Sequence, residues 1–388
     1  MRNRFQSTLK RLSSIHSAQS TAISFYYFPQ TPQNKAHRED AILLKDLIRD
    51  ARKRLEAEGR RAALPDLERI SSAAEEWVRI GGAPRAIFAC AEHGIFESIE
   101  LPDIHGKTAI HVNSRFHLRP LSEAGDKDGA YLVVAADRVS IRFDRYERGE
   151  LKEFDRIDSD IPRKARTDGF GGYDAGHNER HVENWEMRHF KEMADKLKQL
   201  CEGDSFQGVL ILCRSEIRPQ IEPHLHAHAR EKLLGFADVD PAMASEERVR
   251  EEIDGRIAEK RSSEREALVR EVAGESQRNG RGALGLRNVL LAFERGEVQT
   301  VLIGEGLTAH AIECTNCGHL DTRTAKQCAL CLQPVREISD VTDVLVSRAL
   351  GAGIDVAFIE DDEFARAGNI GALLRFRADQ STPAKLAS

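Results

Sequence analysis

Two Cys-x-x-Cys pairs in the last quarter of the chain constrain its fold more than any other feature. Cys314 and Cys317 form the first pair, and Cys328 and Cys331 form the second after ten intervening residues. Such pairs point their thiolates at one ion, and four thiolates make a tetrahedral ligand set that suits zinc. Four sulfurs leave no open position for water. We therefore predict a structural zinc in a small ribbon over residues 312–334.

The other three cysteines are isolated, and they are Cys90, Cys201 and Cys213. We expect them to be reduced residues of the core, because this usage does not suit a disulfide framework. No apolar run approaches the roughly 20 residues that a membrane helix needs. The N-terminus lacks the continuous apolar core of a secretory signal. The sequence therefore predicts a cytoplasmic protein without a membrane partner.

A chain of 388 residues is long enough for two or three domains, and its apolar patterns alternate between strand-like and helical. We predict an α/β (α+β) fold of three domains, with an N-terminal domain over 1–129, a middle domain over 130–240 and a C-terminal domain over 279–388. A long charged linker helix over 241–278, exposed to solvent, is predicted between the last two. Asp240 is its expected N-cap, because Pro241 follows it.

Short runs of β-branched and aromatic residues predict strands, and apolar residues spaced by three or four predict helices. The predicted strands span 23–28, 85–91, 95–100, 131–135, 139–143, 208–213, 300–303, 356–359 and 370–376. The predicted helices span 40–58, 181–201, 287–294 and 343–350, with another helical stretch reaching residue 234. The polar segment 150–180 is predicted to be a long loop of the middle domain, rich in Asp, Gly and Arg.

The formal net charge of −6 excludes a protein that coats nucleic acid by bulk attraction. Contact with RNA would have to come from local groups of Lys and Arg, because such groups neutralise phosphates. One candidate group is N-terminal and comprises Arg2, Arg4, Lys10 and Arg11. The other lies in the middle-domain loop and comprises Arg163, Lys164 and Arg166. A solvated helix face, a transit peptide or a mobile loop would explain the same charges.

Other motifs do not indicate an active site. His224, His226 and His228 would spread over about 200° of a helix and could not all reach one ion. Gly171 and Gly172 precede Tyr173 and lack the Lys-Ser/Thr of a phosphate-binding loop. Neither a Gly-x-Ser-x-Gly elbow nor a His-Glu-x-x-His motif occurs. The residues by themselves therefore predict no active site.

The organisation of the chain resembles the archaeal and eukaryotic peptide-release-factor and Pelota family, in its bacterial branch. The resemblance rests on the run ISFYYFP at 23–29, the charged helix containing Leu43–Leu47, and the motifs Phe116–Pro120 and Asn369–Phe376. It implies an RNase-H-like middle domain and a C-terminal domain with the fold of kink-turn-binding ribosomal proteins. Several members also carry a four-cysteine zinc ribbon in that last domain.

Two departures from the family pattern bear on activity. Release factors of this family carry a Gly-Gly-Gln tripeptide whose glutamine positions the attacking water, whereas this chain reads Gly171-Gly172-Tyr173 at the matching place. The stop-codon-reading Asn-Ile-Lys-Ser motif is also missing from residues 1–129. The pattern is more similar to Pelota and to bacterial ribosome hibernation factors. It implies a hibernation or rescue factor that binds rRNA at the ribosomal A site without hydrolysing peptidyl-tRNA.

The resemblance also suggests partners, and it leaves alternatives open. An elongation-factor-type GTPase such as elongation factor Tu could deliver the protein, which we expect to be a monomer. One alternative is an enzyme, either a residual peptidyl-tRNA hydrolase or an RNase-H-like nuclease. A two-metal nuclease needs clustered carboxylates, and Asp158, Asp160 and Asp168 are close only in sequence. The other alternative is an RNA-binding module that acts away from the ribosome.

Overall fold

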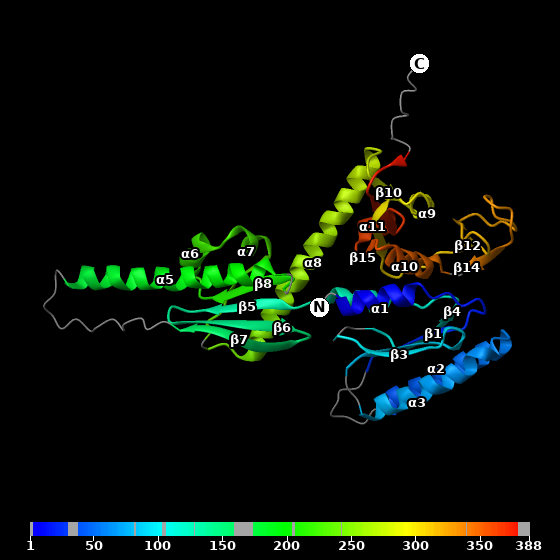
Figure 1. Cartoon of the computed structure of the whole chain (residues 1–388), viewed down its shortest axis with the longest axis horizontal. Coiled ribbons are helices and arrows are strands. Elements are labelled where there is room, and N and C mark those ends of the chain that lie inside the picture. Colours follow the sequence, from blue (N-terminus) through cyan, green and yellow to red (C-terminus); the bar gives the residue numbers. More distant parts are fainter. Residues whose placement is uncertain are drawn as a thin grey trace, which may run out of the picture. The chain divides into compact units, whose positions relative to one another are not determined.

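The computed structural model describes residues 3–29, 38–80, 83–102, 106–127, 129–158, 174–203, 206–241, 243–338 and 340–378. By its internal contacts the chain divides into two compact units. One unit is formed by residues 127–263, and the other combines residues 2–126 with 264–388. Each unit contains mixed sheets and helices, so the predicted α/β class is confirmed (Figure 1).

The N-terminal part of the composite unit contains an antiparallel sheet in the order β3-β2-β1-β4. Its strands are β1 (Ala22–Tyr27), β2 (Arg85–Cys90), β3 (Ile95–Glu100) and β4 (Ala109–Asn113). Its helices are α1 (Asn3–Ser13), α2 (Arg38–Ala57), α3 (Leu64–Ile80) and α4 (Arg119–Lys127), with 3-10 turns at η1 (Arg61–Ala63) and η2 (Ala91–His93). Strands β1, β2 and β3, the 40–58 helix and the β2–β3 hairpin were predicted. Strand β4 and helices α3 and α4 were not.

Strand β1 is buried along its whole length, and all of its residues except Ser24 are apolar or aromatic, because both of its faces are covered. Phe25 and Tyr27 face the core formed with α2 and α3. Tyr26 faces a second core, which also contains Leu9 and Leu12 of α1. Alternation of side chains along a strand divides them between two cores in this way.

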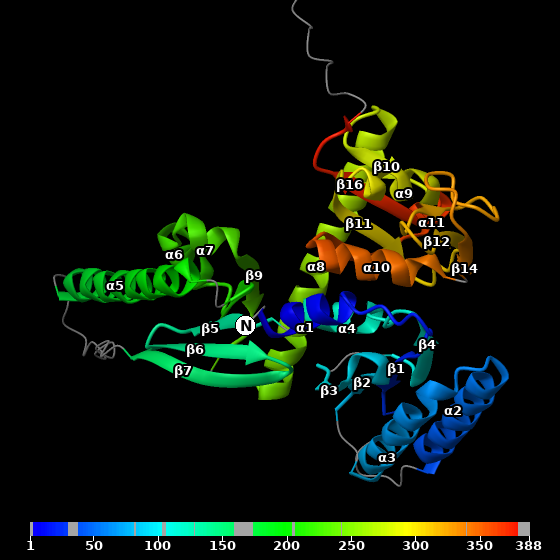
Figure 2. The same ribbon diagram turned by 45° about the vertical axis from the view of Figure 1, so that its right-hand side comes forward.

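The C-terminal part of the same unit has a sheet in the order β10-β16-β11-β15, in which β11 and β15 are parallel. Its elements are β10 (Gly282–Leu284), α9 (Leu286–Glu294), β11 (Val298–Gly304), α10 (Val341–Ala352), β15 (Asp355–Ile359), α11 (Asp362–Arg366) and β16 (Ile370–Leu374). Helix α1 packs along α10, where Ser347 Oγ donates to the carbonyl oxygen of Ser13 at 2.9 Å (Figure 2). The two ends of the chain therefore share one core.

A separate three-stranded sheet follows β11 and forms the predicted ribbon. Its order is β13-β12-β14, with β12 (Ala311–Cys314), β13 (Leu320–Asp321) and β14 (Val335–Ile338) all antiparallel. Helix α10 begins directly after it, and Asp340 caps that helix by accepting from the N–H of Thr342 at 3.0 Å. The ribbon is therefore an insertion between a strand and a helix.

The unit of residues 127–263 is built on a five-stranded sheet in the order β7-β6-β5-β8-β9. Its elements are β5 (Tyr131–Ala136), β6 (Ser140–Glu147), β7 (Glu150–Asp158), α5 (Asp174–Glu202), β8 (Gly208–Cys213), α6 (Arg218–Ile221), η3 (Glu222–His224), α7 (Ala227–Glu231) and β9 (Leu233–Asp238). Three antiparallel strands are followed by two parallel ones, as expected of an RNase-H-like domain. Helix α5 covers one face through Phe190, Met193 and Leu197.

The charged helix α8 (Glu246–Gln277) confirms the long helix but corrects two details. It begins at Glu246, not at Asp240, and Ser245 Oγ accepts from the N–H of Arg248 at 3.2 Å. The helix is also not wholly solvent-facing. Val249, Ile253 and Ile257 are buried against the face of the middle sheet opposite α5. The spacing of four residues places these three side chains on one stripe.

The predicted loop 150–180 is wrong at both ends. Residues 150–158 form strand β7, which pairs with β6, and residues 174–180 belong to helix α5. The strand was missed because β7 pairs at the edge of the sheet and exposes most of its side chains. The predicted helical stretch to residue 234 also ends earlier, because Leu233 and Leu234 open strand β9. In the part of the chain that the structure describes, no helix is both long and apolar enough to cross a membrane.

Candidate functional site

The ribbon brings the four paired cysteines together. The Sγ atoms of Cys314 and Cys331 lie 3.4 Å apart, and those of Cys317 and Cys328 lie 3.6 Å apart. Cys317 and Cys331 are separated by 3.5 Å, and all four sulfurs lie within 4.8 Å of one another. Four sulfurs at about 2.3 Å from one zinc ion would stand slightly less than 4 Å apart. The donor set therefore fits a tetrahedrally coordinated metal ion.

Two matching turns produce this arrangement. In the first, the N–H of Gly318 donates to the carbonyl of Cys314 at 3.1 Å, and in the second the N–H of Leu332 donates to Cys328 at 3.0 Å. The N–H groups of Cys317 and Asn316 also donate to Cys314 Sγ, each at 3.4 Å. The hydrogen bond from the N–H of Cys317 is the largest influence that lowers the pKa of Cys314, which falls to about 6. In the same set a hydrogen bond from the backbone of His319 would lower the pKa of Cys317, but burial and contacts with the other three sulfurs outweigh it and raise that pKa to about 12, so the two thiols do not ionise alike.

A buried carboxylate lies at the base of the ribbon, and sequence reasoning did not identify it. Glu313 precedes Cys314 on β12, and its side chain is 4% exposed. Three arginines from separate segments approach it, and they are Arg115, Arg336 and Arg348. Burial would raise the pKa of Glu313, but the hydrogen bond and charge of Arg336, with the other two charges, hold it below its usual value. The one available signal was an acid inside the otherwise apolar strand Ala311–Cys314.

A second group of possible ligands is less suited to a metal ion. Cys90, Glu92 and His93 also lie within 4.8 Å of one another. Both carboxylate oxygens of Glu92 are already engaged, because they accept from Ser17 Oγ at 2.6 Å and from the N–H of Ala18 at 3.1 Å. These contacts give Glu92 a structural role. Cys90, Cys201 and Cys213 are buried free cysteines, as predicted.

The three histidines considered above do not share a face. His224 belongs to η3, His226 precedes α7, and His228 lies within α7. His226 Nε2 is 3.1 Å from Asp195 Oδ1, and His228 Nδ1 is 3.8 Å from Glu231. The prediction that all three lie on one helix was therefore wrong, and His226 and His228 instead have separate acidic partners.

The N-terminal basic group is only partly open to a ligand. Lys10 is exposed on α1, but Arg11 forms an ion pair with Glu97 of β3. Arg2 lies outside the described residues, and of Arg4 only the helical backbone is described. The opposite face of α1 is buried through Leu9 and Leu12. Helix α1 is therefore a packed element of the fold with a basic outer face.

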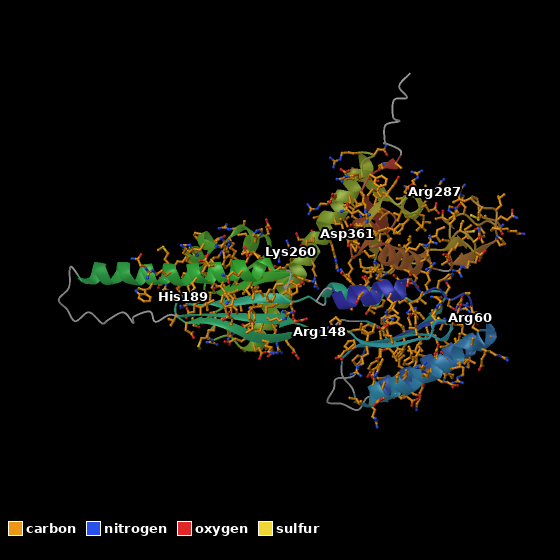
Figure 3. The ribbon with its side chains drawn as sticks, viewed as in Figure 1. Arg60, Arg148, His189, Lys260, Arg287 and Asp361 are labelled. Carbon is orange, nitrogen blue, oxygen red and sulfur yellow. The ribbon has the colours of Figure 1, made fainter. Side chains whose placement is uncertain are left out.

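The middle-domain loop lies outside the described residues. This holds for Gly171, Gly172 and Tyr173, for Arg163, Lys164 and Arg166, and for Asp160 and Asp168. The structure describes the two elements that flank the loop, β7 ending at Asp158 and α5 beginning at Asp174. Further along α5 lies His189, which Figure 3 labels. It is only 2% exposed, and burial lowers its pKa. The base of α5 is thus firmly packed on the sheet.

Comparison with known proteins adds a sequence relationship. Residues 117–258 match the profile of bacterial archaeo-eukaryotic release factor family 10. Peptide chain release factor subunit 1 of Pyrococcus abyssi is 25% identical over 294 residues, covering 68% of this chain and 70% of the relative. The same factor of Archaeoglobus fulgidus is 26% identical over 317 residues, covering 74% and 75%.

Among solved structures, ribosome-bound archaeal Pelota, seen together with ABCE1, is 14% identical over 76% of this chain and 78% of that one, with a TM-score of 0.41. The crystal structure of the archaeal termination factor aRF1 is 14% identical over 97% of this chain and 98% of that one, with a TM-score of 0.25. The chain is therefore similar in sequence to the archaeo-eukaryotic peptide-release factors, and its middle region matches the profile of a bacterial release-factor family.

Proposed function

We propose that this protein is a ribosome-binding translation factor that occupies the A site as a hibernation or rescue factor and does not release the nascent peptide. Its relationship to peptide chain release factor subunit 1 over 68–74% of the chain supports the general class. Release factors work on the ribosome, so a ribosomal partner follows from that relationship. Such a factor acts in the cytoplasm.

The sequence Gly171-Gly172-Tyr173 carries the second half of the proposal. A glutamine at the third position offers an amide that both donates and accepts hydrogen bonds, whereas tyrosine ends in a single hydroxyl on a rigid ring. A phenol cannot occupy the same small space beside the backbone and orient water as an amide does. Loss of the orienting group removes the positional contribution to catalysis. Peptide release is therefore not expected.

The charge of the loop together with the first part of α5 supports the same conclusion. Residues 162–190 contain five Arg or Lys and five Asp or Glu, and those from Asp174 onward belong to α5. A segment that enters the phosphate-rich catalytic centre of the ribosome to promote hydrolysis would gain from an excess of positive charge. A charge-balanced segment is therefore more consistent with binding alone than with promoting hydrolysis.

The four thiolates of the ribbon would hold one zinc ion in this proposal, as Cys314, Cys317, Cys328 and Cys331. Zinc supplies no reaction at a site closed by four sulfurs, and its contribution would be to fold the ribbon. The ribbon then presents a rigid projection to a partner. An elongation-factor-type GTPase is our candidate for delivering the protein, which would bind as a monomer.

Sedimentation separates the proposal from its rivals. Lysates of the source cells, taken during growth and after starvation, would be run on sucrose gradients and probed for this chain. Co-migration with 70S particles in either condition supports the proposal. Free sedimentation in both conditions contradicts ribosome binding and favours an RNA-binding module that acts elsewhere.

A further inference from the structure

The base of the ribbon carries an excess of positive charge. Arg336 lies opposite Glu313 in the β12–β14 register, and its Nε donates to Oε2 at 3.0 Å. Arg348 of α10 donates to Oε1 at 3.0 Å, and Arg115, which follows β4, lies 3.5 Å from the same oxygen. Three guanidinium groups surround one carboxylate. Two positive charges are left in excess.

Partial burial makes this excess costly. The side chains of Arg115, Arg336 and Arg348 are 17%, 30% and 28% exposed. Arg115 Nε is buried and has no hydrogen-bond partner among the described residues. Burial lowers the pKa of Arg115, and its neighbours Arg348 and Arg336 oppose the attraction of Glu313. Buried charges persist when a compensating charge is close by.

The metal centre offers that compensation. Four thiolates around one divalent ion carry two negative charges in excess. Glu313 is directly followed by Cys314, and Arg348 also donates to the carbonyl of Gly318, the residue after Cys317. A Cβ added at Gly318 would come within 3.2 Å of the Arg348 guanidinium. The arginine group therefore packs directly against the first cysteine turn.

We propose that Arg115, Arg336 and Arg348, assembled on Glu313, are the counter-charge of the metal–tetrathiolate centre. The inference rests on the metal site of the proposed function, and the three arginines do not themselves bind the metal ion. The arginine group also links two segments that are distant in sequence. Arg115 belongs to the N-terminal part of the unit, whereas the cysteines belong to the ribbon, so metal loading and the seating of Arg115 favour one another by linkage.

Cobalt(II) titration of the full-length, metal-stripped chain tests whether the arginine charges strengthen metal binding. The affinity for cobalt can be followed by absorbance, because the cobalt–thiolate complex is coloured. Arg336→Met keeps the length of the side chain and removes one charge, and we expect about tenfold weaker cobalt binding. Arg115→Met should show a similar loss, and it leaves every residue of the ribbon unchanged. Arg323→Met is the matched control, because Arg323 lies in the ribbon with a side chain 73% exposed and 3.6 Å from Asp321. It should change cobalt affinity less than about twofold, as exposed charges are well screened.

A double variant distinguishes counter-charge from simple structural support. Glu313→Gln combined with Arg336→Met restores the excess of two positive charges while removing a second member of the network. The counter-charge role predicts cobalt affinity within about threefold of the wild type. A merely structural role predicts that the double variant binds cobalt no better than Arg336→Met alone.

Hydrogen exchange tests the coupling. Metal removal should speed exchange in peptides covering residues 114–118, where the N–H of His117 now donates to Ser24 Oγ at 2.9 Å. Peptides from β6 in the other compact unit serve as the reference, and their exchange should not change.

Unchanged cobalt affinity in the arginine variants, or a loss of affinity in Arg323→Met equal to theirs, overturns the proposal. Variants that keep cobalt affinity but lose ribosome binding assign the arginines to an RNA phosphate instead. A wild type that binds no cobalt overturns the metal centre and its counter-charge together.

Discussion

Gly318 and Leu332 occupy equivalent positions, each directly after the second cysteine of its pair, and both have left-handed backbones. Their φ angles are 72° and 62°. Glycine adopts this conformation freely, whereas for a leucine it costs roughly 1–2 kcal/mol. Packing of the Leu332 side chain offsets little of this conformational free-energy cost, because Leu332 is 70% exposed.

Leu332→Gly is therefore expected to stabilise the metal-loaded ribbon by about 0.5–1 kcal/mol, after the larger chain entropy of glycine in the unfolded state is deducted. Urea denaturation of the zinc-loaded chain measures this. Gly318→Ala is the matched opposite change, and it should destabilise, because its Cβ would meet Arg348 in a left-handed backbone. A destabilised Leu332→Gly variant would show that the leucine side chain makes a stabilising contact.

The imidazole rings of His111 and His117 stack with centroids 4.0 Å apart, and His117 Nδ1 lies 2.6 Å from Asp343 Oδ1. Burial, followed by the charge of His117, lowers the pKa of His111 from 6.5 to about 4. At pH 5 the unfolded chain protonates this histidine and the folded chain does not. The free energy of unfolding should therefore fall between pH 7 and pH 5, by about 1–2 kcal/mol from this group.

His111→Gln removes that contribution, so the difference in stability between wild type and variant should shrink as the pH falls from 7 to 5. Urea titrations at several pH values measure the difference directly. A difference that stays constant across this range would mean that His111 titrates alike in the folded and unfolded chains.

Metal analysis tests the ribbon. The purified chain should contain about one zinc, and replacing Cys314 and Cys317 with Ser should remove it and unfold the ribbon locally, because an incomplete thiolate set cannot close the site. Cys90→Ala is the control, since Cys90 belongs to the other group of possible ligands. It should keep the full zinc content. Wild-type protein free of any metal would refute the site.

The basic group in the middle-domain loop has a measurable signature. Changing Arg163, Lys164 and Arg166 to Ala should weaken ribosome binding and flatten its log–log salt dependence by about two units. The control changes Arg49, Arg52 and Lys53 of α2, which removes the same charge from a helix far from the loop in sequence. If the log–log salt dependence of ribosome binding has the same slope in both triple variants, the loop charges make no specific contact with rRNA.

Elements could be predicted from the sequence where a short run of residues is enough to specify the local structure. The apolar run of β8 and the cysteine pairs identified their elements directly, because burial on both faces and metal-ligand spacing leave strong local marks. Strand β7 left no such mark, since an edge strand can expose polar side chains while its backbone pairs. The prediction of Asp240 as the cap was wrong because Ser245 is an equally good cap and stands directly before Glu246, where the helix starts.

The arginine group at the ribbon base could not be predicted for a different reason. Arg115, Arg336 and Arg348 come from three separate segments, and only the folded chain brings them to Glu313. No spacing in the sequence encodes such a meeting. The prediction of four metal ligands needed only residues 314–331, whereas the groups that support them required the tertiary structure.

One assay tests the central claim most directly. Purified 70S ribosomes would carry labelled peptidyl-tRNA in the P site, and their A site would hold a stop codon, a sense codon or no codon. Each of these three ribosomal states would be mixed with the protein. Bound protein and released peptide would be measured in the same sample, for the wild type and for Tyr173→Gln. We predict saturable binding with peptide release at background in every case, including Tyr173→Gln, because the segment 162–190 stays charge-balanced and the codon-reading motif is missing. Robust release by the wild-type protein, or no binding to any of the three ribosomal states, would contradict the account.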